Sequence, residues 1–556
     1  MYALYDALYF RNAIFGGLAR VSFCGGCYDT AQQQWFVGVP GHLLAGGHLP
    51  FYTNLLNYPE GSNLLQSSIS TVPALIVEPV TQLFGPIAAV NVEMMLGPFL
   101  CAVLMYVALG RWVRWIPARI LGGFIYGFSP FEIHSSIHIF LVFSISLPLL
   151  AMVLDDLLRL KLRSPIKIGL SATGVFFLAY FTSAEIFVTL LIMSVISVGF
   201  YLISTKGRAI LPHIYVIRSV VVAGVSSFLV LIYPIYFQLF GLQHYSGPPQ
   251  QSMWNISSDF LSPFLSSPYE WLGTHQMTAL SVKLVQGISS ENTLYLGLPL
   301  LVLLLVSCKR QNWWVSASLL SAGVLSFGPQ LHVAGNAIGV PLPEIGLLKL
   351  PFLNALIPSR FSLFVFFFAG IQIALWLDHI KGTSFNKRRI YLVFGASLFC
   401  LIPLIPLPVP MQKQSVPSFF KSTVTSVIPQ DSVVVSYPFP TFVHQDAMIW
   451  QAFSHYSFSL PGGYIYVPNS NGHATLFPSV DSQIATTLDA IYEGQNPEMT
   501  QEIVQSCRQE LRSWGVNRVI SSESAPYSRE ANRVLSIIIG KQPQYSQGIF
   551  YWAVKS

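Results

Sequence analysis

A single carboxylate stands in a short stretch that combines thiols, amides and aromatic rings, "CGGCYDTAQQQWF" at residues 24–36. Two interpretations of this residue, Asp29, are open. Asp-Thr before an apolar helical pattern is a good helix N-cap. A carboxylate held near a partly desolvated cationic site can also act as a general base that takes the proton of an acceptor hydroxyl group. Glu60, within the turn pattern "YPEG", is a second candidate acid, although the same pattern predicts a solvated turn.

The cationic candidates lie further along the chain. Arg360 heads the apolar stretch "FSLFVFFFAG", and a planar guanidinium group suits a phosphate or pyrophosphate group. The alternative is an arginine whose long side chain only reaches the membrane interface. Lys349 is a second, weaker candidate for phosphate binding.

Histidines and aromatic residues supply the candidates for substrate contact. His134 and His138 are four residues apart and share one face if the segment is helical. Such a pair can bind a metal, but no H-E-x-x-H pattern is present, so we predict a polar or sugar-contacting face and no metal site. Trp450 and Gln451 belong to an aromatic- and amide-rich stretch at 444–464, which suits either sugar stacking or ordinary packing. Cys24 and Cys27 form a C-x-x-C without a second pair at zinc-finger spacing, which favours a local disulfide or two unpaired thiols.

The composition determines where these residues must be held. The chain has 556 residues, of which 53% are hydrophobic and only 10% are charged, and its mean hydropathy is +0.55. Soluble domains carry about 25% charged residues, so this composition predicts a protein that spans a membrane several times. The net charge of +6 reflects basic loops rather than a surface for nucleic acid, and we assign no nucleic-acid role.

About ten or eleven membrane spans are expected, because apolar runs recur with charged residues between them. Basic loops at 111–119, 159–167, 205–208, 309–310 and 381–389 are cytoplasmic by the positive-inside rule. The intervening loops are then extracytoplasmic, and any chemistry is expected on that side. The ten runs lie at about 88–110, 119–132, 137–157, 167–182, 185–203, 216–240, 294–308, 312–327, 359–380 and 390–409.

Both ends of the chain differ from the apolar middle. Residues 1–22 carry charges that suit neither a span nor a signal peptide, so we expect an unusual first span or a start without an upstream helix. Residues 411–556 combine polar helical patterns with β-branched runs, which predicts an extracytoplasmic α/β domain. The expected organisation is therefore an N-terminal segment and first outer loop (1–87), a transmembrane helical bundle (88–410) and an α/β domain (411–556).

Several short motifs together carry a resemblance to a known superfamily. They are "QQQWF" at 32–36, "HLLAGGHLPFYTNLLNYPEGSNLL" at 42–65, "GFSPF" at 127–131, "ENTLYLGLPLL" at 291–301, "SFGPQL" at 326–331, "LPFLNALIPSRFS" at 350–362 and a C-terminal "GGY". In these motifs the chain resembles uncharacterised bacterial, actinobacterial-type multi-pass membrane proteins, which in turn resemble the GT-C superfamily of membrane glycosyltransferases.

This resemblance implies a reaction and a role for each candidate. GT-C enzymes transfer a sugar from a polyprenyl-phosphate donor to a glycan or protein acceptor at the outer face of a cell membrane. Carried over to this chain, Asp29 is the base, Glu60 a second acid, and Arg360 the ligand of the lipid phosphate. The C-terminal domain then helps to bind the acceptor. The chain departs from the family pattern in its short, charged N-terminus and in lacking a second acid beside Asp29, so a divalent metal is not predicted.

Two non-enzymatic alternatives stay open. A lipid or glycan transporter favours inverted repeats and charged or broken helices near the membrane midplane, whereas this sequence shows no clear repeat and its carboxylates gather toward one edge. A membrane scaffold would use residues 411–556 only to bind a glycan or protein partner.

Overall fold

The fold is mainly helical and divides into two compact units. The computed structural model describes residues 1–24, 26, 28–159, 164–205, 213–246, 256–284, 291–349, 353, 356–383, 386–476 and 482–554. Unit 1 comprises Met1–Ile14, Glu93–Tyr233 and Gln251–Val409, and unit 2 comprises Phe15–Val92, Pro234–Gln250 and Pro410–Ser556. The first outer loop and the C-terminal region, which the sequence suggested as separate parts, are thus portions of one unit.

The predicted apolar runs coincide largely with helices, except that the run at 390–409 is α-helical only as far as residue 399. The helices are α6 (Pro86–Leu109), α7 (Ile116–Gly127), α9 (Ile139–Val142), α10 (Ser146–Leu158), α11 (Pro165–Thr182), α12 (Ala184–Ser204), α13 (His213–Phe240), α15 (Gly297–Ser307), α16 (Trp313–Ser326), α17 (Ser362–Lys381) and α18 (Lys387–Phe399). Among the described residues, six helical segments are long and apolar enough to cross a membrane: α6, α9 with α10, α11, α12, α13, and α17 with the 3-10 turn before it. The chain is a membrane protein, and the count of ten or eleven spans stays a prediction.

Shorter elements complete unit 1. They are α1 (Tyr2–Tyr9), α8 (Pro130–His134), α14 (His275–Leu284), and the antiparallel pair β4 (Gln330–Val333) and β5 (Asn336–Pro341). Residues 1–22, which the sequence marked as a poor span, form α1 and the six-residue α2 (Arg11–Gly16), followed by β1 (Val21–Phe23). The hydroxyl group of Tyr2 donates to the Ile120 carbonyl, which fixes α1 against α7.

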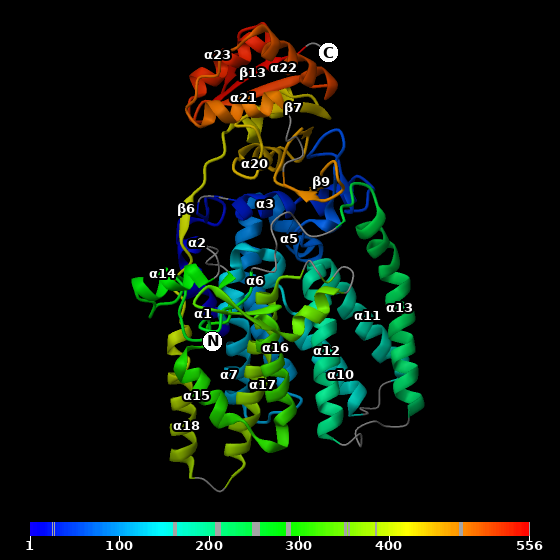
Figure 1. Cartoon of the computed structure of the whole chain (residues 1–556), viewed down its shortest axis with the longest axis vertical. Coiled ribbons are helices and arrows are strands. Elements are labelled where there is room, and N and C mark those ends of the chain that lie inside the picture. Colours follow the sequence, from blue (N-terminus) through cyan, green and yellow to red (C-terminus); the bar gives the residue numbers. More distant parts are fainter. Residues whose placement is uncertain are drawn as a thin grey trace. The chain divides into compact units, whose positions relative to one another are not determined.

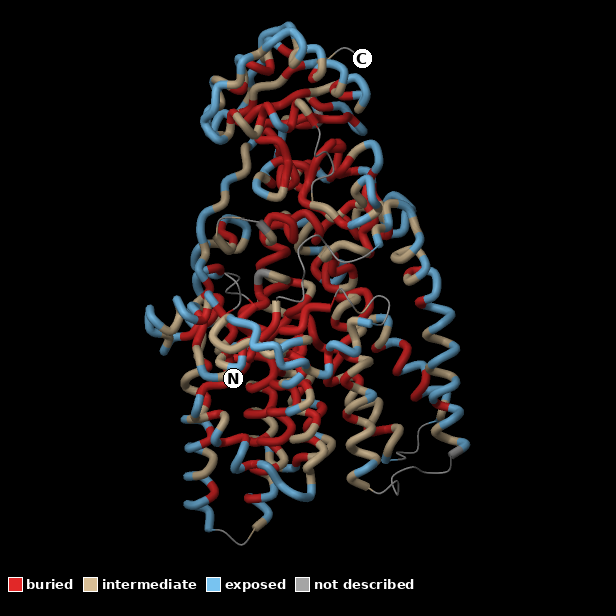
Figure 2. Tube along the Cα trace, in the orientation of Figure 1, coloured by how far each residue is buried: buried red, intermediate tan, exposed pale blue. Residues whose placement is uncertain are grey.

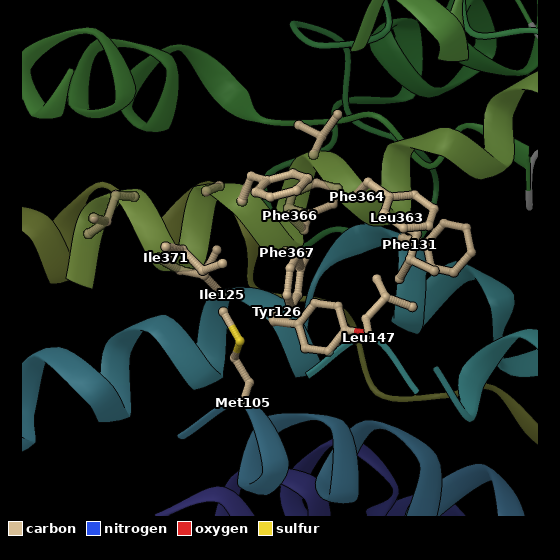
Figure 3. Close-up of a cluster of buried hydrophobic side chains, with 14 of the residues drawn as sticks. Met105, Ile125, Tyr126, Phe131, Leu147, Leu363, Phe364, Phe366, Phe367 and Ile371 are labelled. Carbon is tan, nitrogen blue, oxygen red and sulfur yellow. The ribbon is translucent and has the colours of Figure 1, made fainter. Parts of the chain in front are cut away.

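Helix α17 lies at the centre of the unit 1 core. Within its most apolar window 89% of the residues are buried. The ring of its Phe367 faces Tyr126 of α7 edge to face, with the centroids 5.4 Å apart (Figure 3). Gly122 of α7 and Gly370 of α17 permit this approach, since a Cβ on Gly370 would lie 2.6 Å from the carbonyl oxygen of Gly122. Small residues at such crossings are how helices pack closely within a membrane.

Helix α13 has the opposite character. Only 11% of its most apolar window is buried, and its trace is largely pale blue or tan in Figure 2. Its exposed side chains are nevertheless apolar, including Val221, Phe228 and Leu229. A helix that exposes aliphatic and aromatic side chains to this extent is stable in lipid and not in water.

A five-stranded mixed sheet organises unit 2. Its strand order is β12 (Gln544–Ser546), β13 (Ile549–Ala553), β11 (Arg518–Ser522), β7 (Ser432–Tyr437) and β8 (Phe458–Ser459). Strands β11, β7 and β8 run parallel, and β13 lies between β12 and β11 and is antiparallel to both. The helices and strands predicted between 432 and 553 are present, with α21 (Gln483–Tyr492), α22 (Gln501–Ser513) and α23 (Ser528–Ile539) gathered over the sheet (Figure 1).

The two faces of the sheet are covered by different parts of the chain. Side chains alternate between the faces of a strand. Val433 and Val435 of β7 accordingly join the cluster with α21, α22 and α23, whereas Val434 joins the cluster that contains Trp35 and Trp450. This second face therefore holds α3 (Tyr28–Phe36) from the first outer loop together with α20 (Asp446–Phe453).

The remaining elements of unit 2 are short and connect these layers. They are α4 (Val39–Ala45), α5 (Thr71–Phe84), α19 (Val424–Val427), β2 (Tyr52–Thr53) paired with β3 (Ser62–Asn63), β6 (Met411–Lys413) paired with β1, and β9 (Val467–Pro468) paired with β10 (Ala474–Thr475). The β1–β6 pairing joins the segment after α2 to the start of the C-terminal region.

Candidate functional site

Asp29 lies in the first turn of α3 and is half-buried. Its carboxylate oxygen Oδ1 accepts a hydrogen bond of 2.6 Å from the hydroxyl group of Tyr464. The N-cap interpretation required Asp29 to be the residue before the helix. Asp29 instead lies inside the helix, in its first turn. A carboxylate in the first turn is favoured by the positive end of the helix dipole, and Tyr464 adds a directed donor.

Tyr464 is itself fixed by contacts with α3 and with Phe442. Its carbonyl accepts a 2.9 Å hydrogen bond from Nε2 of Gln32, which lies three residues after Asp29 in α3. Its ring meets that of Phe442 edge to face, with the centroids 4.9 Å apart. Burial, together with the charge of Asp29, raises the pKa of the Tyr464 hydroxyl well above its ordinary value. Tyr464 therefore stays protonated and keeps donating to Asp29 across the physiological range.

The charge of Asp29 also acts on a second tyrosine, Tyr466, which is two residues further along the chain. Burial and the charge of Asp29 raise the pKa of Tyr466 to about 12. Gly462, two residues before Tyr464, lies so close to the backbone that a Cβ there would be 2.4 Å from the carbonyl oxygen of Pro440. The "GGY" motif of the sequence is therefore the segment that brings a phenol to Asp29. The sequence marked this motif but did not assign Tyr464 to the site, because nothing local links residue 464 to residue 29.

Trp450 and Gln451 lie within the packing of α20. The side chain of Gln451 accepts from the indole N–H of Trp35 at 2.5 Å and donates to the carbonyls of Leu55, at 2.9 Å, and Phe458. Trp450 stacks on Phe420 with the ring centroids 4.9 Å apart and 9° between the planes. Both side chains are buried. This arrangement corresponds to the packing alternative rather than to a sugar-contacting surface.

Glu60 is exposed in the turn that contains the cis Tyr58–Pro59 peptide bond. Its carbonyl accepts a hydrogen bond from the hydroxyl group of Tyr52, and Asn57 closes the turn by donating to the Gly61 carbonyl. The surroundings are those of the solvated turn residue that the "YPEG" pattern predicts.

Arg360 lies in unit 1, in a cluster of opposite charges. The side chain is 5% exposed, and its Nη2 lies 2.9 Å from Oε1 of Glu291 while Nη1 lies 3.5 Å from Oε2 of Glu185. Its guanidinium carbon is 5.8 Å from the ring centroid of Phe140. Arg360 is therefore the centre of a buried ion-pair network and not an arginine reaching for the membrane surface.

Glu291 is held in its charged form within this network. Burial alone would raise the pKa of its carboxyl group, but Arg360, His138 and a hydrogen bond from Ser359 outweigh burial and lower that pKa below its ordinary value. The sequence placed Glu291 on the outer side and did not assign it. The indication available was the polar start of the "ENTLYLG" motif before an apolar helix.

The two histidines have different surroundings. His134 ends α8 and is 1% exposed. Its Nε2 lies 2.5 Å from Glu270 and 3.0 Å from the Ser267 hydroxyl, while Nδ1 contacts the carbonyl of Asn292 at 2.9 Å. A 3-10 turn follows α8, so His138 does not continue the helical face of His134. Among the described residues, no group of three or more His, Cys, Asp or Glu side chains is arranged to hold a metal ion.

Two further sequence candidates are located by the structure. Lys349 is exposed at the end of the 3-10 helix Pro343–Lys349 in unit 1. Cys24 takes part in a disulfide bond, whereas Cys27 lies outside the described residues. The free thiols in the described part of the chain are those of Cys101, Cys308, Cys400 and Cys507.

Comparison with known proteins identifies the fold. No protein-family model matches the chain, and no curated protein is similar to it in sequence. Among solved structures, the arabinofuranosyltransferase AftD from Mycobacteria aligns with a TM-score of 0.55 and 12% identity, over 100% of this chain and 40% of AftD. The chain has a GT-C-like fold. This confirms the fold that the sequence motifs indicated. A sequence identity of 12% supports similarity of fold and not of activity.

Two other structures of this GT-C-like set align over most of the chain with lower scores. The oligosaccharyltransferase AglB from Archaeoglobus fulgidus, solved with an inhibitory peptide and a dolichol-phosphate, has a TM-score of 0.46 and 11% identity over 97% of this chain and 70% of AglB. ArnT from Cupriavidus metallidurans has a TM-score of 0.45 and 10% identity over 99% of this chain and 96% of ArnT. The chain spans less than half the length of AftD, which is the neighbour with the highest of the three scores.

Proposed function

We propose that this GT-C-like protein is a membrane glycosyltransferase that moves a sugar from a polyprenyl-phosphate donor to an acceptor hydroxyl group at the extracytoplasmic face. The observation that carries the proposal is the half-buried carboxylate of Asp29, held by the Tyr464 hydroxyl group at 2.6 Å. The fold similarity to AftD supports it. A carboxylate held in position can act as the general base for a sugar or peptide hydroxyl group that comes within hydrogen-bond reach of it.

In the proposed reaction the acceptor oxygen attacks the anomeric carbon of the donor sugar. The bond between that carbon and the phosphate oxygen breaks, polyprenyl phosphate leaves with the electron pair, and Asp29 takes the proton of the acceptor hydroxyl group. Tyr464 orients the carboxylate and does not exchange a proton, because its own pKa lies far above neutrality. The two negative charges of the departing phosphate require a cation, which is the role proposed for Arg360 and Lys349.

The two cations differ in how a phosphate group would reach them. Arg360 is neutralised by Glu291 and Glu185, so a phosphate that binds its guanidinium group replaces one of these carboxylates. Lys349 is exposed and lies at the end of a 3-10 helix. We therefore propose that Lys349 is the first contact of the lipid phosphate, and that Arg360 engages only as Glu185 or Glu291 is displaced.

The decisive experiment measures sugar transfer from a labelled polyprenyl-phosphate donor pool by the purified protein in lipid. The Asp29→Asn variant keeps the size of the side chain and loses the base. We expect its transfer rate to fall by about 100-fold or more, the lower bound for general-base catalysis. Lys349→Gln should raise KM for the donor with a smaller change in kcat, because it weakens binding of the lipid phosphate.

The matched control is Asp431→Asn in the same unit. Asp431 is exposed and has a positive φ of 59°, a conformation that asparagine tolerates well. This variant should keep the wild-type rate. Full activity of Asp29→Asn would refute the assignment of the base, and a loss of activity in both variants would point to a folding defect instead. No transfer from any donor, with specific lipid or glycan binding intact, would favour the transporter or scaffold alternatives.

A further inference from the structure

A cavity of about 320 Å³ lies in the helical bundle of unit 1, among α10, α12, α16 and α17. Its wall is mainly aliphatic and aromatic, and includes Leu147, Leu190, Met193 and Phe367. At one end the lining becomes polar, with Tyr201, Thr205 and Asn312. The volume is within the range of pockets that hold a small ligand or part of a larger one, and the wall chemistry suits a hydrocarbon chain.

A second pocket, of about 260 Å³, adjoins the polar end of this cavity. The two share Gln311, Asn312 and Leu375 in their walls. The second pocket is lined by Lys309, Arg310 and His379, which come from the α15–α16 connection and from the last turn of α17. None of its described lining residues is an aspartate or a glutamate. An apolar cavity and a cationic pocket therefore lie next to each other, with Gln311, Asn312 and Leu375 in the walls of both.

The acidic groups near this site are already engaged by the protein. Asp155, in the wall of the apolar cavity, lies 2.9 Å from Nε of Arg159 and 3.4 Å from Nη1 of Arg111, and it also accepts from the indole N–H of Trp112. Asp378, next to His379, accepts from the backbone N–H groups of Arg114 and Trp115. The acidic groups closest to the site are thus hydrogen-bonded or ion-paired outside the second pocket, whose lining carries the positive charges of Lys309 and Arg310.

The location of the mouth indicates which ligand would meet it. Residues 309–310, 159–167 and 205–208 are basic loops that the positive-inside rule assigns to the cytoplasmic side. Arg159, Thr205 and Gln311 line the apolar cavity, so the cavity opens at that membrane edge. The cytoplasmic leaflet carries anionic lipid headgroups at this level, with acyl chains directed into the bilayer.

We propose that this composite pocket binds one anionic phospholipid of the cytoplasmic leaflet. Lys309 and Arg310 hold the phosphate of the headgroup, and one acyl chain occupies the apolar cavity between α10, α12, α16 and α17. The site is formed by different residues from the proposed transfer site around Asp29, and the positive-inside rule assigns its basic residues to the cytoplasmic face. Its occupant is a structural or regulatory lipid and not the sugar donor.

The test is native mass spectrometry of the purified full chain, titrated with phosphatidylglycerol or with phosphatidylcholine of the same acyl chains. The wild type should retain one phosphatidylglycerol at least tenfold more tightly than phosphatidylcholine. The double variant Lys309→Gln/Arg310→Gln should lose this preference. The matched control Lys387→Gln/Arg388→Gln removes two exposed charges at the start of α18, which is outside the pocket, and should keep it.

The acyl-chain half of the proposal is tested separately. Ser194→Phe places a ring in the apolar cavity, whereas Gly199→Phe places one on α12 where a Cβ meets open space. Phosphatidylglycerol retention should fall about tenfold in the first variant and stay unchanged in the second. If Ser194→Phe does not fold, Ala151→Leu fills the same cavity with fewer atoms.

Several outcomes would overturn the proposal. Equal retention of both lipids by the wild type would refute the proposed headgroup site. An unchanged preference in the Lys309→Gln/Arg310→Gln variant would refute it as well. Displacement of phosphatidylglycerol by soluble glycerol 3-phosphate at equal concentration would show a phosphate site without a lipid tail. Unchanged retention with the cavity filled would place the acyl chain elsewhere. None of these outcomes bears on transfer by Asp29, so failure here is distinguishable from failure of the proposed function.

Discussion

The hydroxyl group of Tyr464 lies 2.6 Å from Oδ1 of Asp29, although 435 residues separate the two positions. The contact exists because α3, from the first outer loop, packs against α20 of the C-terminal region, with the Trp35 indole donating to Gln451 beside it. The carboxylate that the sequence singled out is thus oriented by a residue from the far end of the chain. The C-terminal region therefore contributes a residue, Tyr464, to the surroundings of Asp29.

The first prediction concerns the Tyr464→Phe variant. Without this donor the Asp29 carboxylate loses its fixed orientation, and a misplacement of about 1 Å can cost up to about 100-fold in rate. We therefore expect kcat for sugar transfer to fall about tenfold or more while KM for the acceptor changes little. Removing the donor also makes the Asp29 carboxylate easier to protonate. The acid limb of the pH profile of kcat/KM should therefore move to higher pH, which a merely structural change would not cause.

Tyr456→Phe is the control for this variant. Tyr456 is buried in the same unit, and its hydroxyl group donates to the carbonyl of Trp35 in α3 rather than to Asp29. It should reduce thermal stability without moving the acid limb. An acid limb that shifts equally in both variants, or in neither, would contradict the positioning role of Tyr464.

Local sequence patterns were sufficient for the elements and insufficient for the site. Apolar runs located the helices, because a bilayer demands continuous apolar segments with satisfied backbones. The alternating and β-branched runs located β7, β11 and β13 for a similar reason. The contact between Asp29 and Tyr464 joins residues far apart in the sequence, and no local pattern predicts it. The same holds for the contacts of Arg360 with Glu185 and Glu291. The sequence predicted that Arg360 binds a phosphate group. Residue spacing alone could not show that carboxylates are its partners in the fold.

The second prediction concerns the buried ion pair of Arg360 and Glu291. Removing one partner leaves the other charge uncompensated in a buried place, at a cost of about 3–5 kcal/mol. We expect Arg360→Gln to lower the thermal unfolding temperature more than Glu291→Gln, because Arg360 serves two carboxylates and Glu291→Gln leaves Glu185 in place. The unfolding temperatures of both variants are measured in detergent, with tryptophan fluorescence as the signal.

The double variant Arg360→Gln/Glu291→Gln tests whether the two residues act as a pair. Its destabilisation should be smaller than the sum of the single effects, since the second change removes a charge that the first left unpaired. The exposed Arg533–Glu530 pair is the matched control, and its disruption should cost less than about 1 kcal/mol. Additive effects at Arg360 and Glu291 would contradict the pairing.

The third prediction is a loss of stability in acid that depends on Glu291. Its pKa is lower in the folded protein than its ordinary value of 4.5, so the unfolded chain binds this proton more readily. The stabilisation is present above about pH 4.5 and is lost as the pH falls through the folded pKa. Unfolding temperatures between pH 3 and pH 7 should therefore decline less steeply at the acid end in Glu291→Gln than in the wild type. Parallel pH profiles for the two proteins would show that other groups govern acid unfolding.

The fourth prediction has the opposite sign and concerns Asp489 of α21 in unit 2. Burial, with a further contribution from Glu493, raises its pKa from 3.8 to about 6. The folded chain therefore binds the proton more readily than the unfolded chain, and the carboxyl group destabilises the fold progressively as the pH rises from about 4 to above 6. Asp489→Asn should be more stable than the wild type at pH 7, by about 1 kcal/mol after allowance for the partly exposed position.

The pH dependence separates this effect from a general benefit of losing a charge. The gain from Asp489→Asn should largely disappear near pH 3.5, where the wild-type carboxyl group is protonated in the folded state and mostly protonated in the unfolded state. Asp431→Asn, at an exposed position of the same unit, should show no gain at either pH. A stabilisation by Asp489→Asn that is the same at pH 3.5 and pH 7 would mean that the amide improves packing or hydrogen bonding in α21, and that burial of the charged carboxylate is not its cause.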